Sequence, residues 1–169
     1  MKKKNDGWEQ VLIENECVFY QQLSEEFIEE NLEKIDFIDI LCYQTLSEDF
    51  LERHIYRLNW RAVSIHQTLS EGFIEKYHKE VFWSDICSSQ TLSEEFMRKW
   101  KNQLDWYEVT VNQRMSFDFI VQHFNDIYLE CLHLNNKINK EELKEKEFWL
   151  MAKLRGFQMK NIVKAFINL

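Results

Sequence analysis

The side chains of this 169-residue chain that are best suited to chemistry are its five histidines and four cysteines. Imidazole and thiolate groups bind zinc and activate nucleophiles when the sequence spaces them closely. The set comprises His54, His66, His78, His123, His133, Cys17, Cys42, Cys87 and Cys131. No HExxH or CxxC spacing occurs among them, so neither a zinc site nor a redox pair is predicted. His123, Cys131 and His133 could chelate a metal ion if they folded close together, but we expect no metal site and four free thiols in a reducing compartment.

Serines and carboxylates are the other candidates for catalysis, and their spacing does not favour it. A serine recurs through the chain, but no histidine or acid recurs beside it as nucleophilic catalysis requires. Three glycines and no proline leave no glycine-rich run that could hold a nucleotide phosphate. The formal net charge of −8 argues against a general nucleic-acid binder. We therefore expect no catalytic residue, no cofactor and no enzyme activity.

A repeat with a period of 23 residues organises these side chains. Its marker is a phenylalanine, preceded by serine at three positions and by glutamine at six. The phenylalanines are Phe27, Phe50, Phe73, Phe96 and Phe119. The serines are Ser24, Ser47, Ser70, Ser93 and Ser116, and the glutamines are Gln21, Gln44, Gln67, Gln90 and Gln113. An aromatic residue, Phe37, Trp60, Trp83 or Trp106, follows ten positions after the phenylalanine. Five columns in one register predict a solenoid of stacked units.

Each unit is predicted to contain two helices. Ser93 is suited to cap a helix N-terminus, and the two following glutamates favour the positive end of its dipole. Apolar residues then recur every four positions, as at Phe96, Trp100 and Leu104, which predicts a helix of roughly eleven residues. Asp105, or Asn59 in an earlier unit, would cap a second, shorter helix. Neither helix can bury its apolar face alone, so neighbouring units must stack.

The repeated side chains have two interpretations each. The aromatic columns could stack on nucleic-acid bases, but they share helix faces with Leu, Ile and Val, so we expect core packing. His54 and His123 share their column with Tyr77 and Trp100, which indicates a packing position as well. The glutamines could reach for a ligand, but we expect them to satisfy backbone groups where one helix ends and the next begins.

We therefore predict an all-α chain with the architecture of an α-solenoid. Residues 1–17 form an atypical N-terminal capping segment, residues 18–132 form five 23-residue helical repeats, and residues 133–169 form a basic C-terminal helical cap. Lys2, Lys3 and Lys4 are followed by acidic residues rather than by an apolar run, so no signal peptide is predicted. No stretch has the length and apolarity of a membrane span. These features favour a cytoplasmic protein without membrane contact.

The pattern Gln-x-Leu-Ser-Glu-x-Phe-Ile followed by Trp-x-x-Ile/Val resembles 23-residue repeats of proteins from bacteriophages and large DNA viruses. Residues 66–97 match it best, while Phe37, Phe117 and Leu129 depart from it at the ends. The resemblance implies a viral origin, with the host cytoplasm as location, and an interaction role. It supplies no catalytic residue.

Charge is distributed unevenly along the chain. Residues 1–132 carry a net charge of −12, whereas residues 133–169 carry +4. The acidic side chains are densest between residues 18 and 52, where Lys34 is the only base. They are Glu25, Glu26, Glu29, Glu30, Glu33, Asp36, Asp39, Glu48, Asp49 and Glu52. This acidic run is either a solvated face or a docking surface for a basic partner.

The function that the sequence favours is that of a non-enzymatic protein-binding module. We expect a viral accessory protein that binds and inhibits a basic host protein, such as a nucleic-acid-binding defence nuclease, in the manner of an anti-CRISPR protein. Besides the acidic run, variable positions of the short helices would contact the partner: Ile38, Tyr43, Arg61, His66, Ser84, Tyr107 and Asn112. The alternative is a virion component that self-associates, with the C-terminal helices as a possible homodimer contact. A reader of single-stranded nucleic acid is disfavoured by the acidic repeats, so nucleic acid would be contacted only through the partner.

Overall fold

The computed structural model describes residues 21–138 of the chain, and within that range every regular element is a helix. The chain divides into two compact units, Met1–Phe82 and Trp83–Leu169. Serine-capped helices are α2 (Glu25–Glu30), α4 (Glu48–Arg53), α6 (Glu71–Lys76), α8 (Glu94–Lys99) and α10 (Phe117–Gln122). They alternate with α3 (Phe37–Tyr43), α5 (Trp60–His66), α7 (Trp83–Ser89) and α9 (Trp106–Asn112). Two 3₁₀ helices, η2 (Ile55–Arg57) and η3 (Leu129–Leu134), complete the set.

The serine column caps helices as predicted. The hydroxyl oxygen of Ser70 accepts a hydrogen bond from the backbone N–H of Phe73 at 3.1 Å, and the four other serines make the same bond to their own phenylalanines. Leu69 and Ile74, which flank this cap, are both buried. A hydrophobic contact across the cap fixes the direction in which the chain enters the helix.

The expected eleven-residue helices are wrong, because each one stops after six residues. α6 ends at Lys76, and the next residue, Tyr77, has φ −111° and ψ 30°. A single turn follows, closed by a hydrogen bond of 2.9 Å from the Glu80 N–H to the Tyr77 carbonyl. Phe73 and Val81 are nevertheless both buried. Apolar residues spaced four positions apart fit a helix followed by a turn as well as they fit one continuous helix. Periodicity therefore could not distinguish the two structures.

Asn59 and Asp105 cap shorter helices as predicted, and Asp36 does the same for α3. Asp36, Asn59 and Asp105 each accept a backbone N–H from the first turn of α3, α5 and α9. The aliphatic residue at the fourth position of each shorter helix is fully buried. These residues are Ile40, Val63, Ile86 and Val109. After α10 the corresponding element is η3, a 3₁₀ helix, in which Leu132 is also fully buried.

Three rings meet at each step from a short helix to the next serine-capped helix. In the first unit, the ring of Trp60 lies 5.1 Å from Tyr77, which lies 4.7 Å from Phe73. The corresponding groups are Phe37, Phe50 and His54, then Trp83, Phe96 and Trp100, then Trp106, Phe119 and His123. The packing role expected of His54 and His123 is therefore confirmed. Aromatic groups of this kind dominate the energy of a core.

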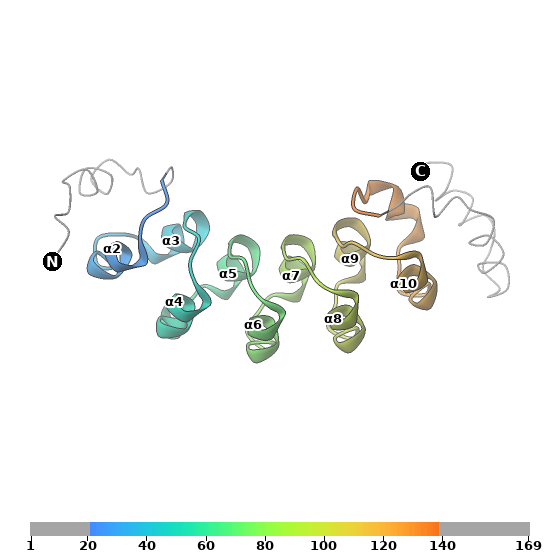
Figure 1. Cartoon of the computed structure of the whole chain (residues 1–169), viewed down its shortest axis with the longest axis horizontal. Coiled ribbons are helices and arrows are strands. Elements are labelled where there is room, and N and C mark those ends of the chain that lie inside the picture. The colour runs from blue at the N-terminus through green and yellow to red at the C-terminus, as the bar shows by residue number, and fades with distance from the viewer. Residues whose placement is uncertain (1–20, 139–169) are drawn as a thin grey trace. The chain divides into compact units, whose positions relative to one another are not determined.

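Helices from successive repeats pack against each other within each unit. In the first unit α3 contacts α5, and in the second unit α7 contacts α9 and α9 contacts η3. Figure 1 shows α3 and α5 in one row of the first unit and α4 and α6 in another; α7 and α9 form the corresponding pair in the second unit, as do α8 and α10. All regular elements between residues 21 and 138 are therefore helical, with helix packing of the kind found in α-solenoids. The predicted capping segment 1–17, and all but the start of the predicted cap 133–169, lie outside the described residues.

Candidate functional site

Four carboxylates of the acidic run join one repeat to the next. Glu25 accepts hydrogen bonds from the Ser47 backbone N–H at 2.6 Å and from its hydroxyl at 3.0 Å. Glu48 makes the same pair of contacts with Ser70, at 2.6 and 3.1 Å. Glu29 lies 2.9 Å from the His54 ring, and Glu52 lies 2.7 Å from the Lys76 ammonium, whose pKa the bond raises. These acidic side chains therefore stabilise the repeat stack and are only partly available to a partner.

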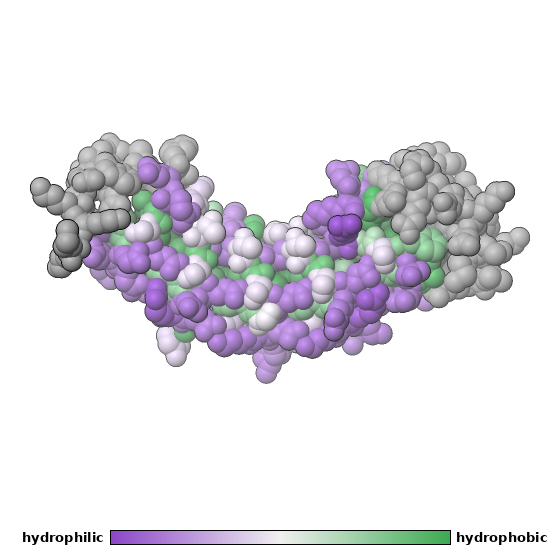
Figure 2. Space-filling view, viewed as in Figure 1, coloured by the Kyte–Doolittle hydropathy of each residue, from purple (hydrophilic) through white to green (hydrophobic). Residues whose placement is uncertain are grey.

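The other carboxylates of the acidic run are placed differently. Glu26, Glu30, Glu33 and Asp49 are exposed, and no hydrogen bond or ion pair joins them to any residue in the range 21–138. Asp36 is exposed as well but caps α3, and Asp39 is half-buried. Hydrophilic side chains cover most of the surface drawn in Figure 2, with apolar ones visible between them. We call Glu26, Glu30, Glu33 and Asp49 the free carboxylates.

Most of the short-helix positions chosen from the sequence are on the surface. The exposed ones are Ile38, Tyr43, Arg61, His66, Ser84 and Tyr107. Asn112 is half-buried, and its amide donates to the Glu108 carboxylate at 2.8 Å. Ser84 donates to Asp105 at 2.9 Å within the second unit.

Sequence reasoning missed several exposed apolar residues. Tyr56 is fully exposed in η2, and Phe82 and Tyr128 are about half exposed. Tyr128 stands where Asp36, Asn59 and Asp105 stand in other repeats, and its ring meets Tyr107 edge-on at 5.7 Å. Phe82 stands at the same position, so both residues depart from a column that otherwise carries Asp or Asn, and this departure was the signal available for them. Nothing in the repeat pattern marks Tyr56.

The glutamines satisfy backbone groups, as expected, and they do so between repeats. The Gln67 side-chain oxygen accepts from the Leu46 N–H at 3.0 Å, while its amide donates to the carbonyls of Leu41 and Gln44 at 2.6 and 2.8 Å. Gln113 repeats all three bonds in the second unit, with Leu92, Cys87 and Gln90. Both side chains are buried. Their amides are therefore committed to the stack and do not reach for a ligand.

The histidines and cysteines do not assemble into a metal centre in the part of the chain that the structure describes. No group of three His, Cys, Asp or Glu residues there could hold an ion. His123 faces Asp126 at 3.3 Å, and His133 contacts the Glu130 carbonyl at 2.8 Å. Cys42, Cys87 and Cys131 are free thiols, and burial raises the pKa of Cys87 to about 12. A thiol with such a pKa is a poor nucleophile.

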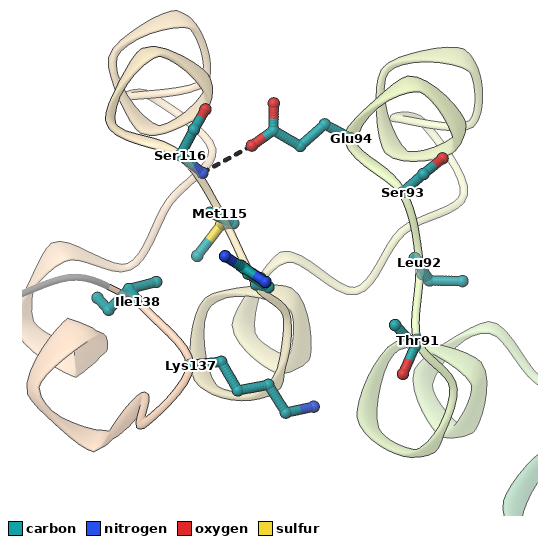
Figure 3. Close-up of a pocket in the computed structure, with 9 residues that line it drawn as sticks. Thr91, Leu92, Ser93, Glu94, Met115, Ser116, Lys137 and Ile138 are labelled. Atoms are coloured by element: carbon teal, nitrogen blue, oxygen red, sulfur yellow. Dashed lines mark hydrogen bonds between the residues drawn. The ribbon is translucent and has the colours of Figure 1, made fainter.

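A groove in the second unit provides a concave surface that could hold a ligand. It has a volume of about 590 Å³ and lies between the loop before α8, the loop before α10 and the residues after η3. Its lining comprises Thr91, Leu92, Ser93, Glu94, Arg114, Met115, Ser116, Lys137 and Ile138. Figure 3 shows Glu94 reaching across to the Ser116 backbone N–H, a hydrogen bond of 2.6 Å. A smaller, shallower hollow of about 400 Å³ lies beside Asp49, Glu52 and Arg53 in the first unit.

The groove contains one carboxylate, which is already hydrogen-bonded within the chain, and two basic side chains. Partial burial opposes ionisation of Glu94, but hydrogen bonds from Ser116 and from Arg98 lower its pKa below the usual value. Glu94 is therefore ionised, and its carboxylate oxygens already accept hydrogen bonds from Ser116 and Arg98. Arg114 and Lys137 are both exposed at the groove.

No helix in the range 21–138 has the length and apolar character that a membrane span requires. No protein-family model, no curated protein and no solved structure matches this chain. Its function must therefore be argued from its own residues.

Proposed function

We propose that the chain is a protein-binding α-solenoid that recognises a basic partner through the free carboxylates of its first repeats. In this proposal five 23-residue units form the scaffold, with a helical cap at each end. The observation that carries the proposal is that Glu26, Glu30, Glu33 and Asp49 are exposed and unpaired within residues 21–138, while the acidic residues around them are used by the stack. Carboxylates that do nothing for the scaffold remain available to a ligand.

Charge distribution supports a basic protein as that ligand. Like charges gathered on one part of a surface steer an oppositely charged partner and discriminate against acidic ones. The exposed side chains of Ile38 and Tyr43 on α3 add apolar area in the same unit. Aromatic and aliphatic anchors beside charged groups are common at protein interfaces.

The repeat itself supports a viral origin. Its resemblance to 23-residue repeats of bacteriophages and large DNA viruses favours an accessory protein that acts in the host cytoplasm. A host protein that binds nucleic acid has a basic groove, and carboxylates can occupy the positions of phosphates in it. Inhibition of such a protein, for example a defence nuclease, is the activity that we propose.

Affinity capture with the full chain tests the acidic surface. The bait is immobilised in a host-cell lysate at about 150 mM salt, where charges more than roughly 8 Å apart are screened. We expect one basic protein to be retained by the wild type and lost from the variant E26Q/E30Q/E33Q/D49N. We also expect the purified pair to dissociate as salt is raised.

A matched variant separates position from overall charge. Glu80, Glu95, Asp118 and Glu130 are also exposed acids, and E80Q/E95Q/D118N/E130Q changes the net charge by the same amount. We expect this control to retain the partner. If both variants lost the partner equally, net charge alone would explain the effect. If both retained the partner, the free carboxylates would not be part of the interface. Recovery of further copies of the chain alone would favour the self-associating structural role instead.

A further inference from the structure

One backbone N–H in the groove of the second unit lacks the partner that its equivalents have. The leucine before each serine cap donates its N–H to the glutamine of the following repeat. The donors are Leu23, Leu46 and Leu92, with N–O distances of 2.7, 3.0 and 3.0 Å. Met115 occupies this position before Ser116, and its N–H makes no hydrogen bond to any residue between 21 and 138. A buried backbone donor left unpaired costs free energy comparable to a lost hydrogen bond.

Asn135 explains why the acceptor is missing. It follows η3 directly, as Gln113 follows α9, and its amide donates to the Thr110 and Gln113 carbonyls at 2.7 and 2.8 Å. Its side chain is one methylene shorter than glutamine, and its oxygen accepts from the Lys137 N–H at 2.7 Å. Asn135 therefore reproduces the donor half of the glutamine contacts but leaves the Met115 N–H without an acceptor.

Two basic residues line the same groove as this donor. The residue before the leucine position is Gln22, Thr45, Thr68 and Thr91 in the first four repeats and Arg114 in the fifth, and Lys137 lies 23 residues further along the chain. Both basic residues line the groove with Met115 and Ile138. In the view of Figure 3, the Lys137 side chain extends toward the loop that carries Thr91. The acidic lining residue, Glu94, is already held by Ser116 and Arg98.

We propose that this groove binds a glutamate or aspartate side chain of an extended peptide segment from a partner protein. The carboxylate accepts the Met115 N–H, in place of the glutamine oxygen of a following repeat, between the Arg114 guanidinium and the Lys137 ammonium. A charged acceptor is favoured over an amide because hydrogen bonds and ion pairs to cations add to the backbone contact. This site is separate from the acidic surface of the proposed function and selects a partner of the opposite charge.

Methionine amide spectra of the full chain test the site directly. The protein is labelled with ¹⁵N-methionine, which gives an amide signal for each of the four methionines after Met1, and M115L assigns the Met115 signal by removing it. The probe is a short Gly/Ser peptide with two glutamates, titrated at about 150 mM salt so that distant carboxylates of the chain are screened. We expect the Met115 amide to shift downfield with saturation, the Met97 amide to stay in place, and the same peptide with two glutamines to bind about tenfold more weakly.

Three variants sharpen the result. R114T/K137T restores the threonine of the earlier repeats and should weaken glutamate-peptide binding about tenfold, since two exposed ion pairs are lost. K79T/K101T removes two exposed lysines elsewhere and should leave binding unchanged. N135Q supplies a longer amide that can accept the Met115 N–H within the chain, so it should shift this amide without peptide and reduce binding about fivefold. The proposal would be overturned if the Met115 signal did not move on titration, as it would not if a later residue of the chain already accepted this N–H. Equal peptide binding by R114T/K137T and the wild type would overturn it as well.

Discussion

Cys87 occupies a position where neighbouring repeats carry a hydroxyl group. The Ser64 hydroxyl accepts the Phe82 N–H at 3.1 Å and donates to the Trp60 carbonyl at 2.8 Å. Thr110 makes the equivalent contacts with Tyr128 and Trp106. Cys87 is fully buried, and its sulfur receives a backbone hydrogen bond from Asp105. A small polar acceptor at this position satisfies the backbone at the start of the next short helix.

Alkaline pH should therefore destabilise the protein through Cys87. Burial raises the thiol pKa from 9.0 to about 12, so the unfolded chain loses this proton at lower pH than the folded one. The resulting stability is complete below pH 9 and is lost as pH rises toward 12. Between pH 8 and 10 we expect urea unfolding of the wild type to lose about 1.4 kcal/mol more than that of C87S. Equal losses would show that the buried thiol does not titrate in this way.

At the scale of elements, side chains rather than packing alone set how one repeat follows another. Gln67 ties the end of α5 to α3 and to the loop that follows α3, and Glu48 at the start of α4 ties that helix to the start of α6. These bonds fall on loops that contain neither glycine nor proline. Loop backbone that would otherwise be unsatisfied is paired by a neighbouring repeat, so short loops can be buried.

Loss of one glutamine should therefore cost much more than a single exposed contact. Q67A removes an oxygen and an amide that pair three buried backbone groups, Leu46 N–H and the Leu41 and Gln44 carbonyls. We expect the free energy of unfolding to fall by about 3 kcal/mol, measured by urea denaturation. Gln103 is exposed after α8, and Q103A should change stability by less than about 0.5 kcal/mol. A Q67A variant as stable as Q103A would contradict the structural role of the ladder.

The sequence predicts the caps and buried columns well because these depend on neighbouring residues. Ser70 and Asn59 cap the helices that follow them, and Phe73 and Val63 are buried. Contacts between repeats were not predictable in this way. Nothing local distinguishes Glu48, which is bound to Ser70, from Asp49, which is exposed. Likewise, Asn135 takes over glutamine contacts one residue before the 23-residue register would place them, because η3 is shorter than α9.

At the scale of the whole molecule, the stabilising contacts join residues that are close to one another in the sequence. The hydrogen bonds that join repeats connect residues 18 to 26 positions apart, about one period of the repeat. Each repeat is therefore stabilised mainly by its immediate neighbours, and its stability can differ from that of repeats further along the chain. Charge also differs along the chain, with the acidic run in the first unit and the Arg114 and Lys137 groove in the second.

Damage to one repeat should consequently remain local. In hydrogen exchange followed by mass spectrometry, the backbone amides of α3, α4 and α5 should lose protection in Q67A. Gln67 follows α5 directly, and its side chain bonds to backbone groups of α3 and of the loop before α4. Amides of α9, α10 and η3 should keep the protection of the wild type, because Gln113 and Asn135 make the corresponding contacts there. Nearest-neighbour coupling in repeat proteins predicts this gradient. An equal loss of protection in both regions would mean that the chain unfolds as one cooperative unit, and the free carboxylates and the groove would then be equally sensitive to any core substitution.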